Sequence, residues 1–144
     1  MQVLGNLLSN ALRYVPAGSH VLVRTQPRDQ DVVISVLDDG PGVLPDYLSH
    51  LFERFWRMDQ SRQRASGGSG LRLSIAAEIV EAQGGRIWAK ETPGSGLTVR
   101  FSLSLSLSRH RGPSCEGIAK WLAPPLAGRA VELCVSGVAR VRSV

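Results

Sequence analysis

NLLSNALRY, residues 6 to 14, lies in the part of the chain that decides the fold. Around it, apolar residues recur three and four positions apart from residue 3 to residue 15, which predicts a helix with one buried face. Asn6, Asn10 and Arg13 share the opposite, polar face of this helix. An amide oxygen suits Mg²⁺ and a guanidinium suits phosphate oxygens, although such side chains on a helix are more often simply solvated.

A second informative stretch is DDGPG, residues 38 to 42, which follows a strongly apolar segment. Residues 20 to 26 and 31 to 38 flank a polar turn and predict a hairpin whose second strand is buried on both faces. A carboxylate where that strand ends, Asp38, can accept a hydrogen bond from an amine such as the amino group of adenine. Glycines there let the backbone approach a ligand closely, although an Asp-Gly turn alone is the simpler interpretation.

The remaining pattern completes a two-layer arrangement. In order, it predicts a short helix from Pro45, a polar loop over residues 57 to 69, a helix over 71 to 83, and hairpin strands over 86 to 91 and 97 to 103. GGSGL, residues 67 to 71, runs into the second long helix, where free N–H groups could face a polyphosphate; a flexible linker with a helix cap is the simpler interpretation. The order of elements predicts an α/β two-layer sandwich, a mixed sheet with helices on one face.

Charge divides the 144 residues into two parts. Residues 1 to 103 carry 11 Lys and Arg against 10 Asp and Glu, whereas residues 104 to 144 carry 6 against 2. We therefore expect one folded domain over residues 1 to 103, a basic and weakly ordered extension over residues 104 to 144, and no nucleic-acid binding. The sequence has no apolar run long enough to span a bilayer, no signal peptide pattern and no metal-binding spacing of its two cysteines, which favours a cytoplasmic protein without membrane insertion.

Five motifs, in family order, resemble those of bacterial two-component sensor histidine kinases. NLLSNALRY is similar to their N box and DDGPG to their G1 box. The other three are LFERFWR at residues 51 to 57, similar to the F box, GGSGLRL at residues 67 to 73, similar to the G2 box, and GSGLTV at residues 94 to 99, similar to the Gly-rich hairpin that follows. The resemblance covers essentially all of residues 1 to 103 and implies their ATP-binding catalytic domain, a Bergerat-type (GHKL) fold without a P-loop.

The resemblance assigns roles on the first helix. Asn10 would ligate Mg²⁺ and Asn6 would flank the phosphates, with Arg13 and Tyr14 also facing the nucleotide; Asn6, Asn10 and Arg13 are the expected catalytic residues. Gyrase-like and chaperone ATPases of this fold place a glutamate at the position of Asn6 to activate water, whereas an amide cannot act as a general base. Transfer of phosphate to a protein side chain, a protein histidine kinase activity, therefore fits better than hydrolysis.

The resemblance also assigns the adenine pocket and the lid. Asp38 would bind the adenine amino group, and Gly40 and Gly42 would shape its pocket. Residues 57 to 69 would form a mobile lid. The other expected nucleotide-binding residues are Phe52 and Phe55, which would hold the lid, and Gly68, Gly70 and Leu71, which would lie at the phosphates.

The histidines decide which partners the resemblance implies. His20, His50 and His110 lack the acidic residue and arginine that usually follow a phosphoacceptor histidine in this family. A separate dimerisation-domain protein would therefore supply the histidine in trans. Through this partner the phosphoryl group would reach a response regulator, and a partner that is a membrane sensor would recruit the chain to the membrane.

Two departures leave an alternative function open. Arg72 stands where the family has a third G2-box glycine, and the chain begins inside the N box, which predicts an uncovered sheet edge or apolar surface. A catalytically silent nucleotide-binding or docking module is the alternative to a working kinase. An anti-sigma-type serine kinase fits less well, because that family generally lacks an F box.

Overall fold

The structure of the chain is a computed structural model, which describes residues 2–56, 70–92, 94, 96–104, 131–134 and 138–142. The elements are, in chain order, α1 Gln2–Tyr14, β1 His20–Arg28, β2 Asp31–Asp38, the 3₁₀ helix η1 Pro45–Phe52, α2 Arg72–Ala82, β3 Arg86–Glu91, β4 Leu97–Ser104, β5 Val131–Cys134 and β6 Val138–Arg142.

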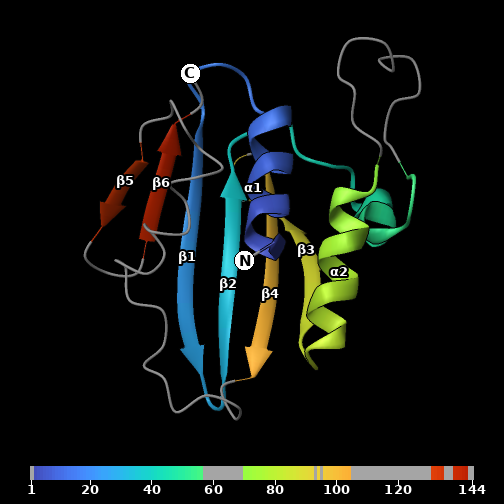
Figure 1. The fold of residues 1–144 in the computed structure, drawn as a ribbon. Coiled ribbons are helices and arrows are strands. Elements are labelled where there is room, and N and C mark those ends of the chain that lie inside the picture. The colour runs from blue at the N-terminus through green and yellow to red at the C-terminus, as the bar shows by residue number, and fades with distance from the viewer. Residues whose placement is uncertain are drawn as a thin grey trace.

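The strands form one sheet in the order β3-β4-β2-β1-β6-β5 (Figure 1). Three hairpin pairs, β1 with β2, β3 with β4 and β5 with β6, are joined by the pairs β2 with β4 and β1 with β6. Every one of these described pairings is antiparallel, so the prediction of a mixed sheet is wrong for this part of the chain. The physical reason is that the long connection through η1 and α2 runs β3 in the direction of β2, but β4 returns by a hairpin and lies between them, antiparallel to both.

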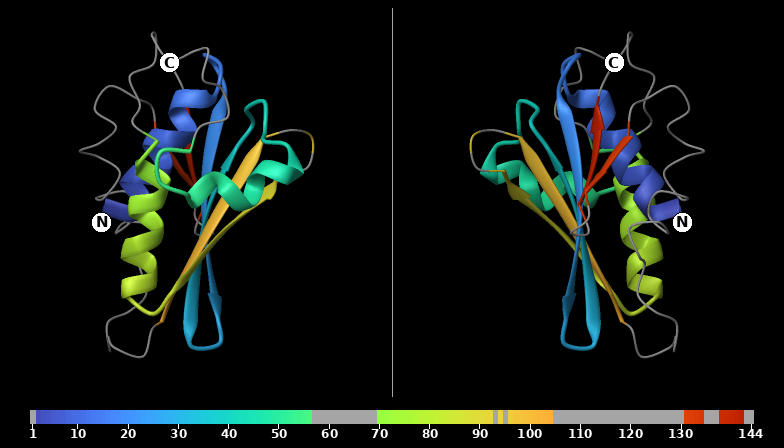
Figure 2. Two further views of the ribbon diagram at one scale, coloured as in Figure 1. Left: turned by 90° about the vertical axis from the view of Figure 1, so that its right-hand side faces the viewer. Right: turned by 90° about the vertical axis from the view of Figure 1, so that its left-hand side faces the viewer.

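Helices α1 and α2 pack beside each other on one face of the sheet (Figure 2). The core lies between the layers and includes Leu7 and Leu8 of α1, Val80 of α2 and Phe101 of β4, each at most 2% exposed. Leu7 and Leu8 fall on the buried face that the three-and-four spacing predicted, and β2 is buried on both faces as its apolar run predicted. The two-layer α/β class with helices on one face is therefore confirmed.

Two elements differ in detail from the sequence pattern. The helix that begins at Pro45 is a 3₁₀ helix, and β1 continues past residue 26 to Arg28. Pro27 fits within β1 because it lies next to the hairpin turn, opposite Val32, where Asp29 has a left-handed φ of 54°. The predicted loop over residues 57 to 69 lies outside the described residues.

Two segments from the last part of the chain extend the sheet. β6 pairs with the outer edge of β1 from His20↔Arg142 to Arg24↔Val138, and β5 pairs with β6. The uncovered sheet edge that we expected is therefore not found at β1, whose outer backbone groups face a further strand. Among the described residues, no helix combines the length and the hydropathy that crossing a bilayer requires.

Candidate functional site

Helix α1 presents three polar side chains beside its buried face. Asn6, Asn10 and Arg13 are all half-buried, one helical turn apart along the same side of α1. The Nε atom of Arg13 is buried and has no hydrogen-bond partner among the described residues. Tyr14, at the end of the helix, is 57% exposed. Helix α1 thus places two amides and a guanidinium on one side. The buried Nε of Arg13 has no acceptor among the described residues.

Asp38 ends β2 and is held by two backbone N–H groups. Its Oδ1 accepts hydrogen bonds from the N–H of Gly40 at 3.0 Å and of Leu97 at 3.2 Å. None of the described residues donates to its Oδ2. Burial raises the pKa of Asp38; the two backbone hydrogen bonds lower that pKa and the charge of Asp39 raises it further. One carboxylate oxygen is therefore fixed by backbone N–H groups, while the other has no donor among the described residues.

Glycines keep the surroundings of Asp38 tightly packed. A Cβ on Gly40 would lie 2.9 Å from Asp38 Oδ1 and 3.2 Å from Val15 Cγ1. Gly96 has a φ of 110°, and a Cβ there would overlap the carbonyl oxygen of Asp38. Gly42, with a φ of 73°, lies against the backbone of Gly96. The DDGPG turn and the second Gly-rich hairpin therefore approach each other as closely as backbone allows, and they hold the carboxylate between them.

The two ends of the predicted lid meet at a backbone contact. The N–H of Phe55 donates to the carbonyl of Gly70 at 3.2 Å, and both residues have a left-handed backbone, with φ of 64° and 66°. Phe52 is half-buried against the core, whereas Phe55 is 69% exposed. Gly68, the other glycine expected at the phosphates, lies outside the described residues. Phe55 and Gly70, which flank residues 57 to 69, are thus joined just before α2.

The first turn of α2 has N–H groups that no side chain caps. Leu71 precedes the helix, and no side-chain hydrogen bond is made there. The hydroxyl of Ser74 instead donates to the carbonyl of Leu71 at 3.0 Å. Arg72, which replaces the expected glycine, is exposed. An uncapped helix start next to Gly70 is a suitable place for an anion.

Known proteins resemble this chain in sequence and in fold. Residues 1–107 match the family described as histidine kinase-, DNA gyrase B-, and HSP90-like ATPases. The chain belongs to this family. The chain is 45% identical over 111 residues to the signal transduction histidine-protein kinase BaeS of Escherichia coli K12, covering 77% of this chain and 24% of BaeS. It is 44% identical over 104 residues to the sensor histidine kinase WalK of Bacillus subtilis, covering 71% and 17%. It therefore spans about a quarter of these relatives or less.

Solved structures of the family share the fold. The mycobacterial sensor histidine kinase MprB superposes with a TM-score of 0.63 at 29% identity, over 72% of this chain and 68% of that one. Full-length ShkA, solved in complex with AMPPNP, superposes with a TM-score of 0.62 at 32% identity, over 81% and 24%. These relatives and structural neighbours are histidine kinases, and the chain shares with them the domain of this ATPase family.

Sequence reasoning did not predict how Asp38 is held. The N–H of Leu97 and the close approach of Gly96 come from β4, far along the chain from β2. The Gly-rich hairpin before a strand was the available signal, because such glycines mark close backbone approaches. A second unforeseen contact is the pair of hydrogen bonds from the His20 N–H to the carboxylate of Asp39, at 3.0 and 3.1 Å, which anchors the DDGPG turn to β1.

Proposed function

We propose that the chain binds Mg-ATP between α1, the DDGPG turn and the start of α2, and transfers the γ-phosphate to a histidine on a separate protein. The observation that carries the nucleotide part is Asp38, whose Oδ1 is held by two backbone N–H groups while Oδ2 accepts nothing from the described residues. An acceptor of this kind is complementary to the amino group of adenine. The glycines packed around it leave no room for side chains at these positions.

The phosphates are assigned to the polar face of α1 and to the start of α2. Arg13 offers a guanidinium with a buried, unpartnered Nε, and α2 offers uncapped N–H groups beside Gly70 and Leu71. Gly68, from the same Gly-rich segment, would add a further N–H. Asn6 would flank the phosphates, and Tyr14 would face the nucleotide from the end of α1.

Asn10 is the residue that would hold Mg²⁺. Mg²⁺ is usually held by one or two protein oxygens together with phosphate oxygens and waters, so a single half-buried amide on α1 fits this chemistry. No cluster of three or more His, Cys, Asp or Glu side chains that could form a self-sufficient cage occurs in the described ranges. When bound, Mg²⁺ would neutralise charge on the β- and γ-phosphate oxygens during transfer.

The type of reaction follows from Asn6 and from the histidines. An amide at Asn6 cannot take a proton from water, so this position supports phosphate transfer over hydrolysis. His20 and His50 are both exposed. His20, in β1, lies 3.7 Å from the carboxylate of Asp39. His50, in η1, lies 2.7 Å from the carboxylate of Glu53. Neither lies on a long helix of the kind a dimerisation domain would provide. The acceptor histidine would therefore lie on a dimerisation-domain partner, which hands the phosphoryl group to a response regulator in the cytoplasm.

A transfer experiment tests the proposal. The purified chain is mixed with γ-labelled ATP, Mg²⁺ and separately purified dimerisation domains of sensor kinases, and acid-labile label on the partner is measured. We expect label on one partner, none on a His→Gln form of that partner, and none with the Asn10→Ala chain. Normal ATP binding with no label on any partner would refute phosphotransfer while leaving the nucleotide site intact.

A second candidate is a silent nucleotide-binding or docking module, which Arg72 favours because its side chain stands at the anion-binding start of α2. Calorimetry of Mg-ATP with the wild-type chain and Arg72→Gly separates the two. Binding only in the glycine variant would support the silent module, and equal binding would support a working site.

A further inference from the structure

The face of the sheet that points away from α1 and α2 carries a group of positive side chains. Side chains alternate between the two faces along a strand, and the core residues Val23, Ile34 and Phe101 point to the helices. The register then places on the other face Arg24 and Arg28 of β1, Arg100 of β4, and Arg86 and Lys90 of β3. We call these five residues the cationic face. Figure 2 shows both long helices on the opposite side of the sheet.

These charges are not compensated within the described part of the chain. Within strands β1 to β4, the register adds one acidic residue to this face, Asp31, which lies opposite Arg28; Asp29, in the turn between β1 and β2, lines the same hollow. The three ion pairs found among the described residues use His20, His50 and Arg54, and none uses a member of the cationic face. The Nε of Arg100 is buried and has no hydrogen-bond partner in the same described residues. A buried guanidinium nitrogen without an acceptor costs free energy, and an external carboxylate would reach the terminal N–H groups of the same guanidinium.

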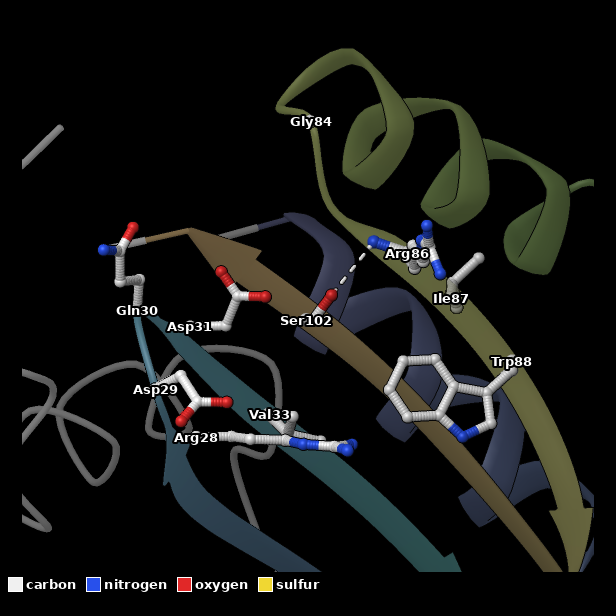
Figure 3. Close-up of a pocket in the computed structure, with 10 residues that line it drawn as sticks. All are labelled: Arg28, Asp29, Gln30, Asp31, Val33, Gly84, Arg86, Ile87, Trp88 and Ser102. Carbon is white, nitrogen blue, oxygen red and sulfur yellow. Dashed lines mark hydrogen bonds between the residues drawn. The ribbon is translucent and has the colours of Figure 1, made fainter. Parts of the chain in front are cut away.

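A tryptophan lies among the charges. Trp88 lies in one row with Arg100, Ser35 and Arg24, across four neighbouring strands. Beside this row the surface is hollowed, and Figure 3 shows Arg28 extended next to Val33 with its guanidinium directed toward Trp88. Tryptophan and arginine are the residue types that contribute most strongly to protein interfaces.

Charge decides which kind of partner suits this face. Residues 105 to 130 of the same chain carry four Lys or Arg against one Glu, so they have the same sign as the cationic face. Two copies meeting symmetrically through this face would oppose like charges. We therefore propose that the cationic face docks an acidic amphipathic helix of a partner protein, with carboxylates on Arg24 and Arg100 and apolar side chains on Trp88.

Spacing supports a helix laid across the strands. Arg24 and Arg100 flank β2, so their strands are separated by two inter-strand steps, about 10 Å at 4.7–4.9 Å each. Two turns of an α-helix also span about 11 Å, which places carboxylates seven residues apart over the two arginines. Each guanidinium can bind a carboxylate through two parallel N–H groups. Asp38 accepts its backbone hydrogen bonds at the end of β2, and the proposed partner touches none of the residues assigned to the nucleotide.

A labelled synthetic helical peptide tests the proposal with the full chain. The peptide carries Glu seven residues apart with Leu on the same side, and fluorescence anisotropy measures its binding at low salt. We expect saturable binding that weakens about tenfold or more with Arg24→Glu/Arg100→Glu, weakens with added salt, and is lost when Gln replaces Glu in the peptide. A peptide with Lys in place of Glu should bind the reversed variant, which restores the pairs with opposite sign.

Controls separate this face from other basic surfaces and other anions. Arg109→Glu/Arg111→Glu, in the tail, should bind the peptide as the wild type does, and Mg-ATP affinity should be unchanged in both double variants. Should the Arg24/Arg100 variant fold poorly in thermal melting, Lys90→Glu and Trp88→Ala are measured in its place, and each should weaken binding. Undiminished binding by the reversed or substitute variants, or loss of binding in the tail variant, would overturn the proposal. Binding of phosphatidylserine vesicles or a single-stranded oligonucleotide without binding of the peptide would also overturn it.

Discussion

Asp38→Asn separates the role of a charge from the role of a shape at one position. The asparagine oxygen can still accept from the N–H groups of Gly40 and Leu97, which now donate to Oδ1 at 3.0 and 3.2 Å. The amide nitrogen then occupies the place of Oδ2 and donates hydrogen bonds where the carboxylate accepts them. An adenine amino group, itself a donor, would meet a donor.

The expected loss of affinity follows from one charged hydrogen bond. Such a bond contributes about 1.5–3 kcal/mol, which corresponds to about 10- to 150-fold weaker binding of Mg-ATP. Inosine triphosphate, which carries an oxo group in place of the amino group, should lose less affinity or gain some, because the new amide can donate to it. The preference for ATP over inosine triphosphate should therefore fall in the variant.

Asp38→Asn should weaken ATP binding but should not lower folding stability. Burial raises the pKa of Asp38 above 3.8, so the folded chain favours the protonated carboxyl more than the unfolded chain does. That stabilising contribution is complete below pH 3.8 and is lost as the pH rises through the raised pKa. Asparagine does not titrate, so the melting temperature of Asp38→Asn, compared with the wild type, should rise across this window and be equal or higher at neutral pH.

Isothermal calorimetry with both nucleotides and melting curves between pH 3 and pH 7 measure these effects together. Asp39→Asn is the matched control, because the carboxylate of Asp39 is exposed. This variant should bind ATP as the wild type does. Unchanged ATP affinity in Asp38→Asn would refute the adenine assignment. A lower melting temperature of Asp38→Asn than of the wild type at neutral pH would refute the inference that burial of the ionised Asp38 carboxylate is costly.

Three further changes have defined outcomes. Gly96→Ala should lower the free energy of unfolding by about 2 kcal/mol or more in urea denaturation, because the new Cβ would overlap a carbonyl oxygen. Gly5→Ala should raise the free energy of unfolding by about 0.5–1 kcal/mol, because there is open space around Gly5 in helix α1. Arg54→Ala should cost less than about 1 kcal/mol despite an N–O distance of 2.6 Å to Glu78, since both side chains are exposed; a double-mutant cycle showing a larger coupling would contradict this. Ala139→Pro should lower the urea midpoint, because this residue lies between β1 and β5, and an unchanged midpoint would mean that β6 adds nothing to stability.

Local sequence patterns predicted the elements because each pattern reflects burial of one face. The spacing of Leu7 and Leu8 placed α1 on the core, and the apolar run of β2 reflects a central strand with neighbours on both sides. Asp38 could be singled out because a charge directly after a buried strand is unusual unless it is paired. These are short-range signals that do not depend on how the elements assemble.

Contacts between distant segments could not be predicted in this way. The hydrogen bond from the Leu97 N–H to Asp38 depends on the register of β4 against β2, which no local pattern fixes. The antiparallel pairing throughout the described sheet and the pairing of β6 with β1 likewise depend on assembly. The cationic face could not be recognised from the sequence, because its members are spread over three strands. In the net charge of the domain their positive charges are balanced by acidic residues elsewhere.

The position of β6 has a consequence for how the chain folds. His20, in β1, pairs with Arg142, which lies far along the chain. Closing such a long loop is slow compared with forming the local hairpin of β1 and β2, so the outer edge of β1 stays available until β5 and β6 have been synthesised. During that interval the edge can accept the hairpin of β5 and β6 from a second molecule. Concentrated refolding should therefore yield domain-swapped dimers, and dilute refolding should yield monomers.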